Sequence, residues 1–262
     1  MTTQGTIHPT AIVSSEAAVA RDAVIGPYAI IGPHVTIGPG TVIGPHTRIE
    51  GPTTIGERNH ITGHACIGMP PQDVKFRGER TELIIGNDNL FREFVTVSRG
   101  TAGGGAITTI GSENFFMAYA HVAHDCHVGS NTIFANNATL AGHVDVGDHA
   151  TIGAFSGVHQ HCRVGDHAFI GGGTIPTQDV LPFVKTVGSR PAKTYGINTL
   201  GLARKGFSRE SIEALQRAYR LLVRSKLRVE EALARIEDEV GFFSEVRYFA
   251  EFVRSSKRGV VR

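Results

Sequence analysis

Hydrophobic residues recur every six positions along most of this chain. The run begins at Ile7, keeps its phase to Ile67, and returns over 85–97 and 110–170. Glycine often follows the aliphatic residue directly, and a small or β-branched residue usually stands four positions after it. A period of six matches neither the 3.6-residue turn of an α-helix nor the two-residue alternation of one long strand.

The repeat predicts short strands joined by corners, with the aliphatic and the small residue both pointing inward. Three repeats close a triangular coil of 18 residues, and the coils stack as parallel strands ~4.8 Å apart. We expect glycine to supply backbone freedom at the corners. Such a solenoid has a narrow core and gains stability coil by coil. The sequence therefore predicts a mostly β protein, with a parallel β-helix over residues 1–190.

Two segments interrupt the repeat, near residues 69–83 and 98–109. The first is polar, and the second contains three consecutive glycines. A solenoid accommodates such insertions as loops on its outside, often at the binding face. We therefore expect two external loops on the β-helix.

The period becomes helical after the β-helix, which predicts a C-terminal α-helical domain over residues 191–262. Ser208 is the expected N-cap of a helix, with Phe207 packed against Ile212. Apolar residues at helical spacing predict three helices. These lie around 212–222, 229–236 and 246–253.

The net charge, the cysteines and the apolar segments of the sequence argue against several classes of protein. The formal charge of +2 gives no reason to expect nucleic-acid binding. The three cysteines form no CxxC pair, which argues against a disulfide framework or a thiolate zinc site and favours a reducing compartment. We find neither a secretory signal nor an apolar run of the ~18 residues that span a membrane. The expected location is the cytoplasm.

The 18-residue coil places polar side chains in columns on one outer ridge. His124 and Gly142 share a column with Gln160, and Asp125 shares the next column with His143 and His161; a third column contains His159. A neutral imidazole can deprotonate a hydroxyl, and a neighbouring carboxylate can fix its tautomer. The bare amide of Gly142 can face a developing oxyanion. This set can activate a hydroxyl against a thioester with no metal and no cofactor.

Other histidines and the cysteines have simpler interpretations. His127, Asp145 and Arg163 form a column that we interpret as a solvated polar ladder. Cys126 and Cys162 occupy inward positions, so we expect buried packing.

Several short motifs carry a resemblance to a known family. They are His121-Val-Ala-His124-Asp125-Cys126, Val158-His159-Gln160, Gln72-Asp73-Val74-Lys75, Arg99-Gly100-Thr101 and the segment from Gly201 to Arg209. Together they closely resemble the bacterial UDP-N-acetylglucosamine O-acyltransferases that start lipid A biosynthesis, which are hexapeptide-repeat proteins. The resemblance spans nearly the whole chain, and it implies that the β-helix is left-handed.

The resemblance implies transfer of a 3-hydroxyacyl group from acyl carrier protein to the 3-hydroxyl of UDP-N-acetylglucosamine. It implies a homotrimer with sites between neighbouring β-helices. His124 would be the base, assisted by Asp125, and Gly142 N–H would hold the oxyanion. Gly172 matches the position that limits acyl length, and the basic tail would meet the acidic carrier protein. The implied substrate-binding residues are Gln72, Asp73, Lys75, His121, His143, His159, Gln160, Gly172, Asn198, Arg204 and Lys205.

Three departures from the family pattern concern the periphery of this site. Ser98 stands where a histidine is usual, Leu200 replaces an acidic residue, and the segment 189–193 is one residue longer. The acyl chain length, and the choice between N-acetylglucosamine and a 3-amino variant, therefore stay open.

Three alternative functions stand beside the O-acyltransferase. A related N-acyltransferase carries an additional N-terminal domain, whereas the repeat here begins at Ile7. A zinc hydratase on the same fold would use His121, His124 and His143 as ligands. Flat threonine-rich faces would favour a non-enzymatic scaffold, and the loops and the histidine ridge do not.

Overall fold

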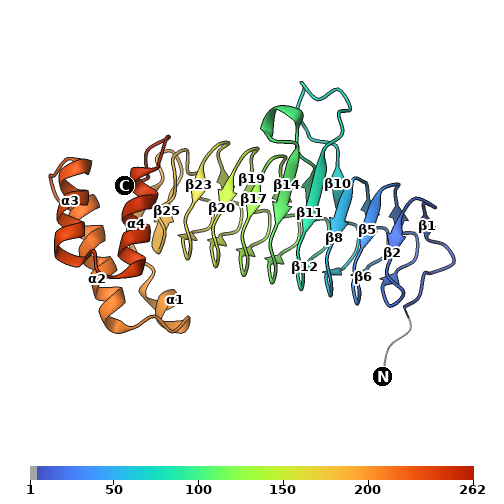
Figure 1. Cartoon of the computed structure of the whole chain (residues 1–262), viewed down its shortest axis with the longest axis horizontal. Coiled ribbons are helices and arrows are strands. Elements are labelled where there is room, and N and C mark those ends of the chain that lie inside the picture. Colours follow the sequence, from blue (N-terminus) through green and yellow to red (C-terminus); the bar gives the residue numbers. More distant parts are fainter. Residues whose placement is uncertain (1–4) are drawn as a thin grey trace.

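A computed structural model describes residues 5–262 of the chain. The first four residues of the predicted 1–190 segment lie outside the described residues. Short parallel strands stack so that Ile12 pairs with Ile30 and Ile30 with Arg48, a step of one 18-residue coil. Figure 1 shows these coils along the long axis of the molecule, with the helices at the C-terminal end. The structure confirms the predicted parallel coil and its length.

The strands form three sheets, one for each side of the coil. The first sheet contains β1 (Ile12–Val13), β4 (Ile30–Ile31), β7 (Arg48–Ile49), β10 (Cys66–Met69), β13 (Thr96–Ser98), β16 (His121–Val122), β19 (Thr139–Leu140) and β22 (Gly157–Val158). The second contains β2 (Ala18–Val19), β5 (Val35–Ile37), β8 (Thr53–Ile55), β11 (Glu82–Ile85), β14 (Ile107–Ile110), β17 (His127–Val128), β20 (Asp145–Val146) and β23 (Arg163–Val164). The third contains β3 (Val24–Ile25), β6 (Val42–Ile43), β9 (His60–Ile61), β12 (Leu90–Phe91), β15 (Phe115–Phe116), β18 (Ile133–Phe134), β21 (Thr151–Ile152), β24 (Phe169–Ile170), β25 (Val184–Val187) and β26 (Lys193–Ile197).

The aliphatic residue of each repeat fills the narrow core. In the third sheet, Phe91, Phe116 and Phe134 replace the isoleucines of earlier coils and are fully buried. Their rings stack with centroids 4.8 and 4.7 Å apart. Stacked aromatic pairs contribute about 0.5–1.5 kcal/mol each to folding stability, in addition to the contribution of the area they bury. We therefore expect the stacked rings to stabilise these coils.

An asparagine ladder occupies one inward column, in which a small or β-branched residue is usual. Asn59, Asn89 and Asn114 are buried in successive coils. Asn89 Nδ2 donates to Asn59 Oδ1 at 2.9 Å and to the Gly111 carbonyl at 3.0 Å. Asn114 N–H donates to Asn89 Oδ1 at 2.9 Å. These coils are exceptions to the usual pattern, because an asparagine amide can satisfy the corner backbone groups that a small residue leaves to other partners.

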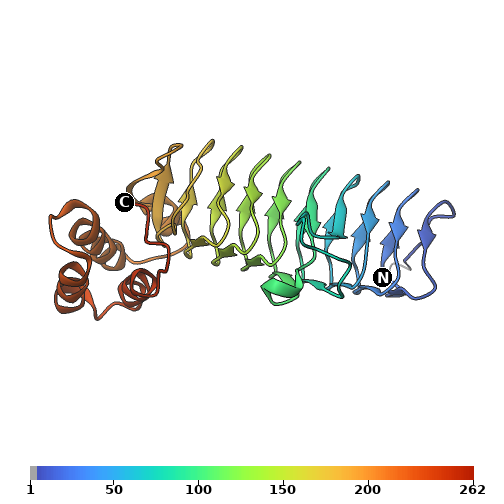
Figure 2. The ribbon, with the colours of Figure 1, turned by 90° about the horizontal axis from the view of Figure 1, so that it is seen from above.

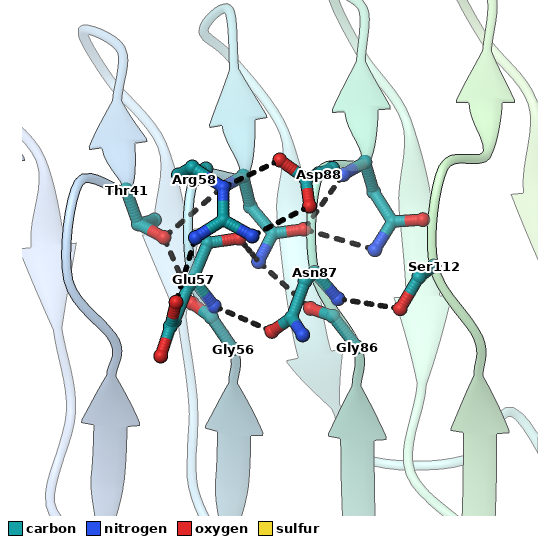
Figure 3. Close-up of polar contacts among 10 residues, drawn as sticks. Thr41, Gly56, Glu57, Arg58, Gly86, Asn87, Asp88 and Ser112 are labelled. Atoms are coloured by element: carbon teal, nitrogen blue, oxygen red, sulfur yellow. Dashed lines mark hydrogen bonds and ion pairs between the residues drawn. The ribbon is translucent and has the colours of Figure 1, made fainter.

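The outside of the same corner carries a second set of polar contacts, which Figure 3 shows. The Glu57 N–H donates to Asn87 Oδ1 at 2.8 Å, and the Asn87 N–H donates to Ser112 Oγ at 2.9 Å. Arg58 binds both carboxylate oxygens of Asp88, at 2.7 and 2.8 Å. Exposed ion pairs contribute little to stability, so the buried amide ladder carries more weight than the surface pair.

Replacing Asn89 by alanine is expected to destabilise the β-helix by about 2–4 kcal/mol, since it leaves the buried Asn114 N–H and the Gly111 carbonyl without their hydrogen-bond partner. The urea midpoint of unfolding measures this loss. Asn136→Ala is the matched control, because Asn136 is exposed on a later coil. Equal midpoints for the two variants would contradict a stabilising role for the ladder.

The corners use non-glycine residues in the left-handed conformation. Arg58, His46 and His64 have φ values of 52°, 55° and 53°. Glycine serves a different purpose at positions such as Gly44, where a Cβ would lie 1.9 Å from the Thr62 carbonyl oxygen of the next coil. The expectation that glycine supplies corner freedom was therefore wrong at these positions: glycine there permits close approach between coils.

Two loops project from one side of the β-helix near β10 and β14 (Figures 1 and 2). Residues 70–81 connect β10 to β11, and residues 99–106 connect β13 to β14. The second loop contains a short 3₁₀ helix, η1 (Ala102–Gly104).

Past the last coil the chain departs from the parallel pattern. β26 pairs antiparallel with β25 at the end of the third sheet. The helices that follow are α1 (Thr199–Arg204), α2 (Arg209–Tyr219), the π-helix η2 (Arg220–Arg224), α3 (Val229–Val240) and α4 (Ser244–Arg254). The Ser208 side chain accepts from the Ser211 N–H at 3.0 Å, which confirms the predicted N-cap. None of the helices described between residues 5 and 262 is long and apolar enough to cross a membrane.

Candidate active site

His124 and Asp125 lie at the corner between β16 and β17. The Nδ1 atom of His124 is 2.7 Å from Asp125 Oδ2, and the Asp125 side chain is fully buried. Asp125 has φ 58°, and its N–H donates to Thr108 Oγ1 at 2.8 Å. An ionised carboxylate only accepts hydrogen bonds, so Nδ1 carries the proton and Nε2 is free to accept one. This arrangement suits a general base.

Gly142 lies one coil beyond His124. The His143 N–H donates to the His124 carbonyl and the His161 N–H to the Gly142 carbonyl, at 3.0 and 3.2 Å, which fixes the register of the column. A Cβ on Gly142 would lie 2.5 Å from Cε1 of the His124 ring. Within residues 5–262, the Gly142 N–H donates to no backbone carbonyl. The predicted base and the predicted oxyanion donor are therefore neighbours.

Three further histidines gather around this pair. The His143 ring packs edge-on against His124 with centroids 5.1 Å apart, and it stacks on His161 at 4.4 Å. His121 Nδ1 is 2.7 Å from Thr96 Oγ1. Burial lowers the pKa of His121, and burial also lowers the pKa of His143 despite the nearby Asp125 carboxylate. His121 and His143 are therefore neutral near pH 7 and available as polar substrate contacts.

The two loops and two of these histidines form a cavity of about 280 Å³. Asp73 and Lys75 from the first loop line it, opposite His143 and His161. The Lys75 N–H donates to Asp73 Oδ1 at 2.9 Å, which orders this part of the loop. Gln72 is exposed beside it. The structure thus brings most of the predicted loop residues to the predicted histidine ridge.

Several residues around this cavity were not predicted from the sequence. Phe76, Glu79 and Thr101 also line it, and Thr101 donates two hydrogen bonds to Asp125. The interrupted repeat at 98–109 and the motif Arg99-Gly100-Thr101 both pointed to this segment, but neither singled out Thr101. His161 shares the predicted column with His143, and the 18-residue register was the signal that could have included it.

The predicted residues of the next coil lie at the surface of the same ridge. His159 and Gln160 are both exposed, and Arg258 from the C-terminal tail lies 3.5 Å from His159 Nδ1. Gly172 is exposed but does not lie on this ridge: it follows β24 of the third sheet, and a Cβ there would meet the Ala154 carbonyl oxygen at 3.2 Å.

The remaining predicted residues lie elsewhere in the chain. Asn198 precedes α1, and Arg204 and Lys205 end it. Lys205 is close enough to His167 to lower the pKa of that imidazole, and His167 lies at the corner between the second and third sheets. His124 lies at the corner between the first and second sheets. One chain therefore does not bring Asn198, Arg204 and Lys205 to His124.

The departures from the family pattern also have defined places. Ser98 is buried at the end of β13, and the Leu200 side chain in α1 is 71% exposed. The segment 189–193 covers the reversal between β25 and β26 and ends at Lys193, the first residue of β26.

The histidine ridge also contains a set of side chains suited to a metal ion. Ligand atoms of His124, Asp125 and His143 lie within 4.8 Å of one another. This set differs from the three histidines considered above, because His121 faces Thr96. Both Asp125 oxygens already accept hydrogen bonds from Thr101, and Oδ2 also contacts His124 Nδ1.

The chain matches two family models. Residues 107–142 match the bacterial transferase hexapeptide (six repeats), and residues 179–261 match domain 2 of UDP N-acetylglucosamine O-acyltransferase. Two similar curated proteins are the acyl-[acyl-carrier-protein]–UDP-N-acetylglucosamine O-acyltransferases of Syntrophobacter fumaroxidans and Myxococcus xanthus. They are 52% and 50% identical over 256 residues, which is 98% of this chain and 99% of each relative.

Solved structures agree with these matches. The UDP-N-acetylglucosamine O-acyltransferase of Moraxella catarrhalis is 44% identical with a TM-score of 0.95, and it covers 98% of this chain and 99% of its own. The UDP-N-acetylglucosamine acyltransferase of Francisella novicida is 36% identical with the same TM-score, covering 98% and 94%. The predicted left-handed β-helix with C-terminal helices is thereby confirmed. This chain is an enzyme and belongs to the family of acyl-[acyl-carrier-protein]–UDP-N-acetylglucosamine O-acyltransferases.

Proposed function

We propose that this enzyme transfers a 3-hydroxyacyl group from the thioester of acyl carrier protein to the 3-hydroxyl of UDP-N-acetylglucosamine. The observation that carries the proposal is the His124–Asp125 pair, with Nδ1 held at 2.7 Å by a buried carboxylate and Gly142 directly beside the ring. The names of the relatives support the two substrates.

In this mechanism His124 Nε2 takes the proton of the sugar hydroxyl as the oxygen attacks the thioester carbonyl. Asp125 stabilises the imidazolium that forms, and the Gly142 N–H donates to the oxyanion of the tetrahedral adduct. Collapse of the adduct breaks the carbon–sulfur bond, and the imidazolium returns its proton to the carrier-protein thiolate. The reaction balances without a metal or a cofactor.

Substrate binding is assigned to the residues around this centre. Asp73 and Lys75, with Gln72 beside them, would hold sugar and acyl oxygens, and His143 and His121 would contact the sugar. His159 and Gln160 would line the same site, and Gly172 would leave room for a long acyl chain.

The remaining binding residues would come from a neighbouring subunit. Asn198, Arg204 and Lys205 lie away from His124 in their own chain, so they would meet a sugar nucleotide across the interface of a homotrimer. Cationic side chains suit a diphosphate. Lys257 and Arg258 line a cavity that also reaches His143, and they would attract the acidic carrier protein.

A direct assay tests the proposal. The purified protein is incubated with a mixture of acyl and 3-hydroxyacyl carrier-protein thioesters, and with UDP-N-acetylglucosamine or its 3-amino analogue. Mass spectrometry is expected to detect one 3-hydroxyacyl ester of the sugar nucleotide and an equal amount of free carrier-protein thiol. Hydrolysis of the thioester without an acylated sugar, or acylation of the 3-amino analogue alone, would contradict it.

A further inference from the structure

The second loop holds the carboxylate of Asp125 at both oxygens. The Thr101 N–H donates to Oδ1 at 2.7 Å, and the Thr101 hydroxyl donates to Oδ2 at 2.6 Å. Gly104, in the 3₁₀ turn that follows, packs against the same group, since a Cβ there would lie 2.1 Å from Asp125 Cγ. The loop therefore encloses the carboxylate on the side away from His124.

These contacts determine how the carboxylate faces the imidazole. Oδ2 accepts from Thr101 and from His124 Nδ1, while Oδ1 accepts from Thr101 alone. One donor is the Thr101 backbone N–H, and the other is the Thr101 hydroxyl, which is close to that backbone. Rotation of the carboxylate therefore breaks at least one of these hydrogen bonds. Hydrogen bonds to ionised groups are about twice as strong as those between neutral groups, so the bound orientation is strongly preferred.

We propose that Thr101 is a positioning residue of this enzyme: it fixes the Asp125 carboxylate that in turn orients His124. The loop at 99–106 is then a functional part of the site and not a tolerated insertion. This inference rests on the roles of His124 and Asp125 in the proposed function.

Replacing Thr101 by valine removes the hydroxyl and keeps both the N–H and the branched shape. We expect kcat to fall about 10- to 100-fold, as for loss of a hydrogen bond to a charged group, with little change in KM for the sugar nucleotide. Thr101→Ser restores the donor and is expected to stay within about threefold of the wild type. Thr109→Val is the matched control, because Thr109 Oγ1 contacts the exposed His127 instead, at 2.9 Å.

A double-mutant cycle with Asp125→Ala separates positioning from a general effect on the fold. Once the carboxylate is gone, Thr101→Val is expected to cost no more than about a further twofold in kcat. Gly104→Ala is a second, independent test, because its methyl group would clash with the Asp125 carboxylate. It should lower the activity of the enzyme that has Asp125 and cause no further loss in the Asp125→Ala background.

The outcomes distinguish the two proposals. Wild-type activity of Asp125→Ala would remove the support for the proposed mechanism itself. If Asp125→Ala is impaired, two results would overturn the positioning role alone. One is a Thr101→Val variant as active as Thr109→Val. The other is the same loss of activity from Thr101→Val with and without Asp125.

Discussion

Replacing His124 by alanine is expected to lower kcat for acyl transfer by about 10²- to 10⁴-fold, the usual contribution of a general base. The structure gives the reason: Nδ1 is held by the buried Asp125 carboxylate, so Nε2 is the nitrogen left to take the proton of the sugar hydroxyl. Initial rates with saturating substrates, measured by mass spectrometry of the acylated sugar nucleotide, provide the test.

His127→Ala is the matched control for this prediction. His127 is the next strand residue on the chain, at the exposed edge of β17, and it pairs in register with Asp145 on the polar ladder. The control should keep wild-type kcat, and both variants should melt close to the wild-type Tm, because neither ring lies in the core. A His124→Ala enzyme within a few-fold of the control would remove His124 as the base.

The β-helix could be predicted because the same pattern of inward residues recurs in every coil. An inward aliphatic residue every sixth position determines both the sheets and the 18-residue register, and that register correctly placed His124 beside Gly142. The asparagine ladder had the same signal, since Asn59, Asn89 and Asn114 each stand four positions after an inward isoleucine. It was missed because asparagine was not considered as an inward residue.

Features that break the period could not be predicted in the same way. Thr101 meets Asp125 across 24 residues, through a loop whose length departs from the repeat. The antiparallel pairing of β26 follows a reversal that contains Pro191. Helix α1 spans only six residues, too few for an amphipathic pattern to identify it.

The inward positions of the site were easier to predict than its polar contacts. Cys126 and Cys162 are both fully buried, as the repeat predicted, and burial raises their thiol pKa to about 12 and about 11. Both thiols are therefore protonated at neutral pH and unsuited to act as nucleophiles. A thiol-based alternative to His124 finds no support in these residues.

Replacing Gly142 by alanine is expected to lower kcat by at least about 10²-fold, because displacing a reacting group by 1 Å can cost that much. The added methyl group would lie 2.5 Å from Cε1 and 2.8 Å from Nε2 of His124, so the ring must move from its place beside Asp125. The backbone does not oppose the change, since Gly142 is not among the glycines with a left-handed φ. The expected defect is therefore local to the site, and Tm should change little.

The double variant His124→Ala/Gly142→Ala identifies the cause of that loss. With the imidazole absent, the methyl group has room, and the Gly142 N–H remains available to the oxyanion. Adding Gly142→Ala to the His124→Ala enzyme should then change its residual rate by less than about threefold. A further 100-fold loss in that background would instead mean that the methyl group blocks the substrate or its oxyanion directly, and the steric argument through His124 would fail.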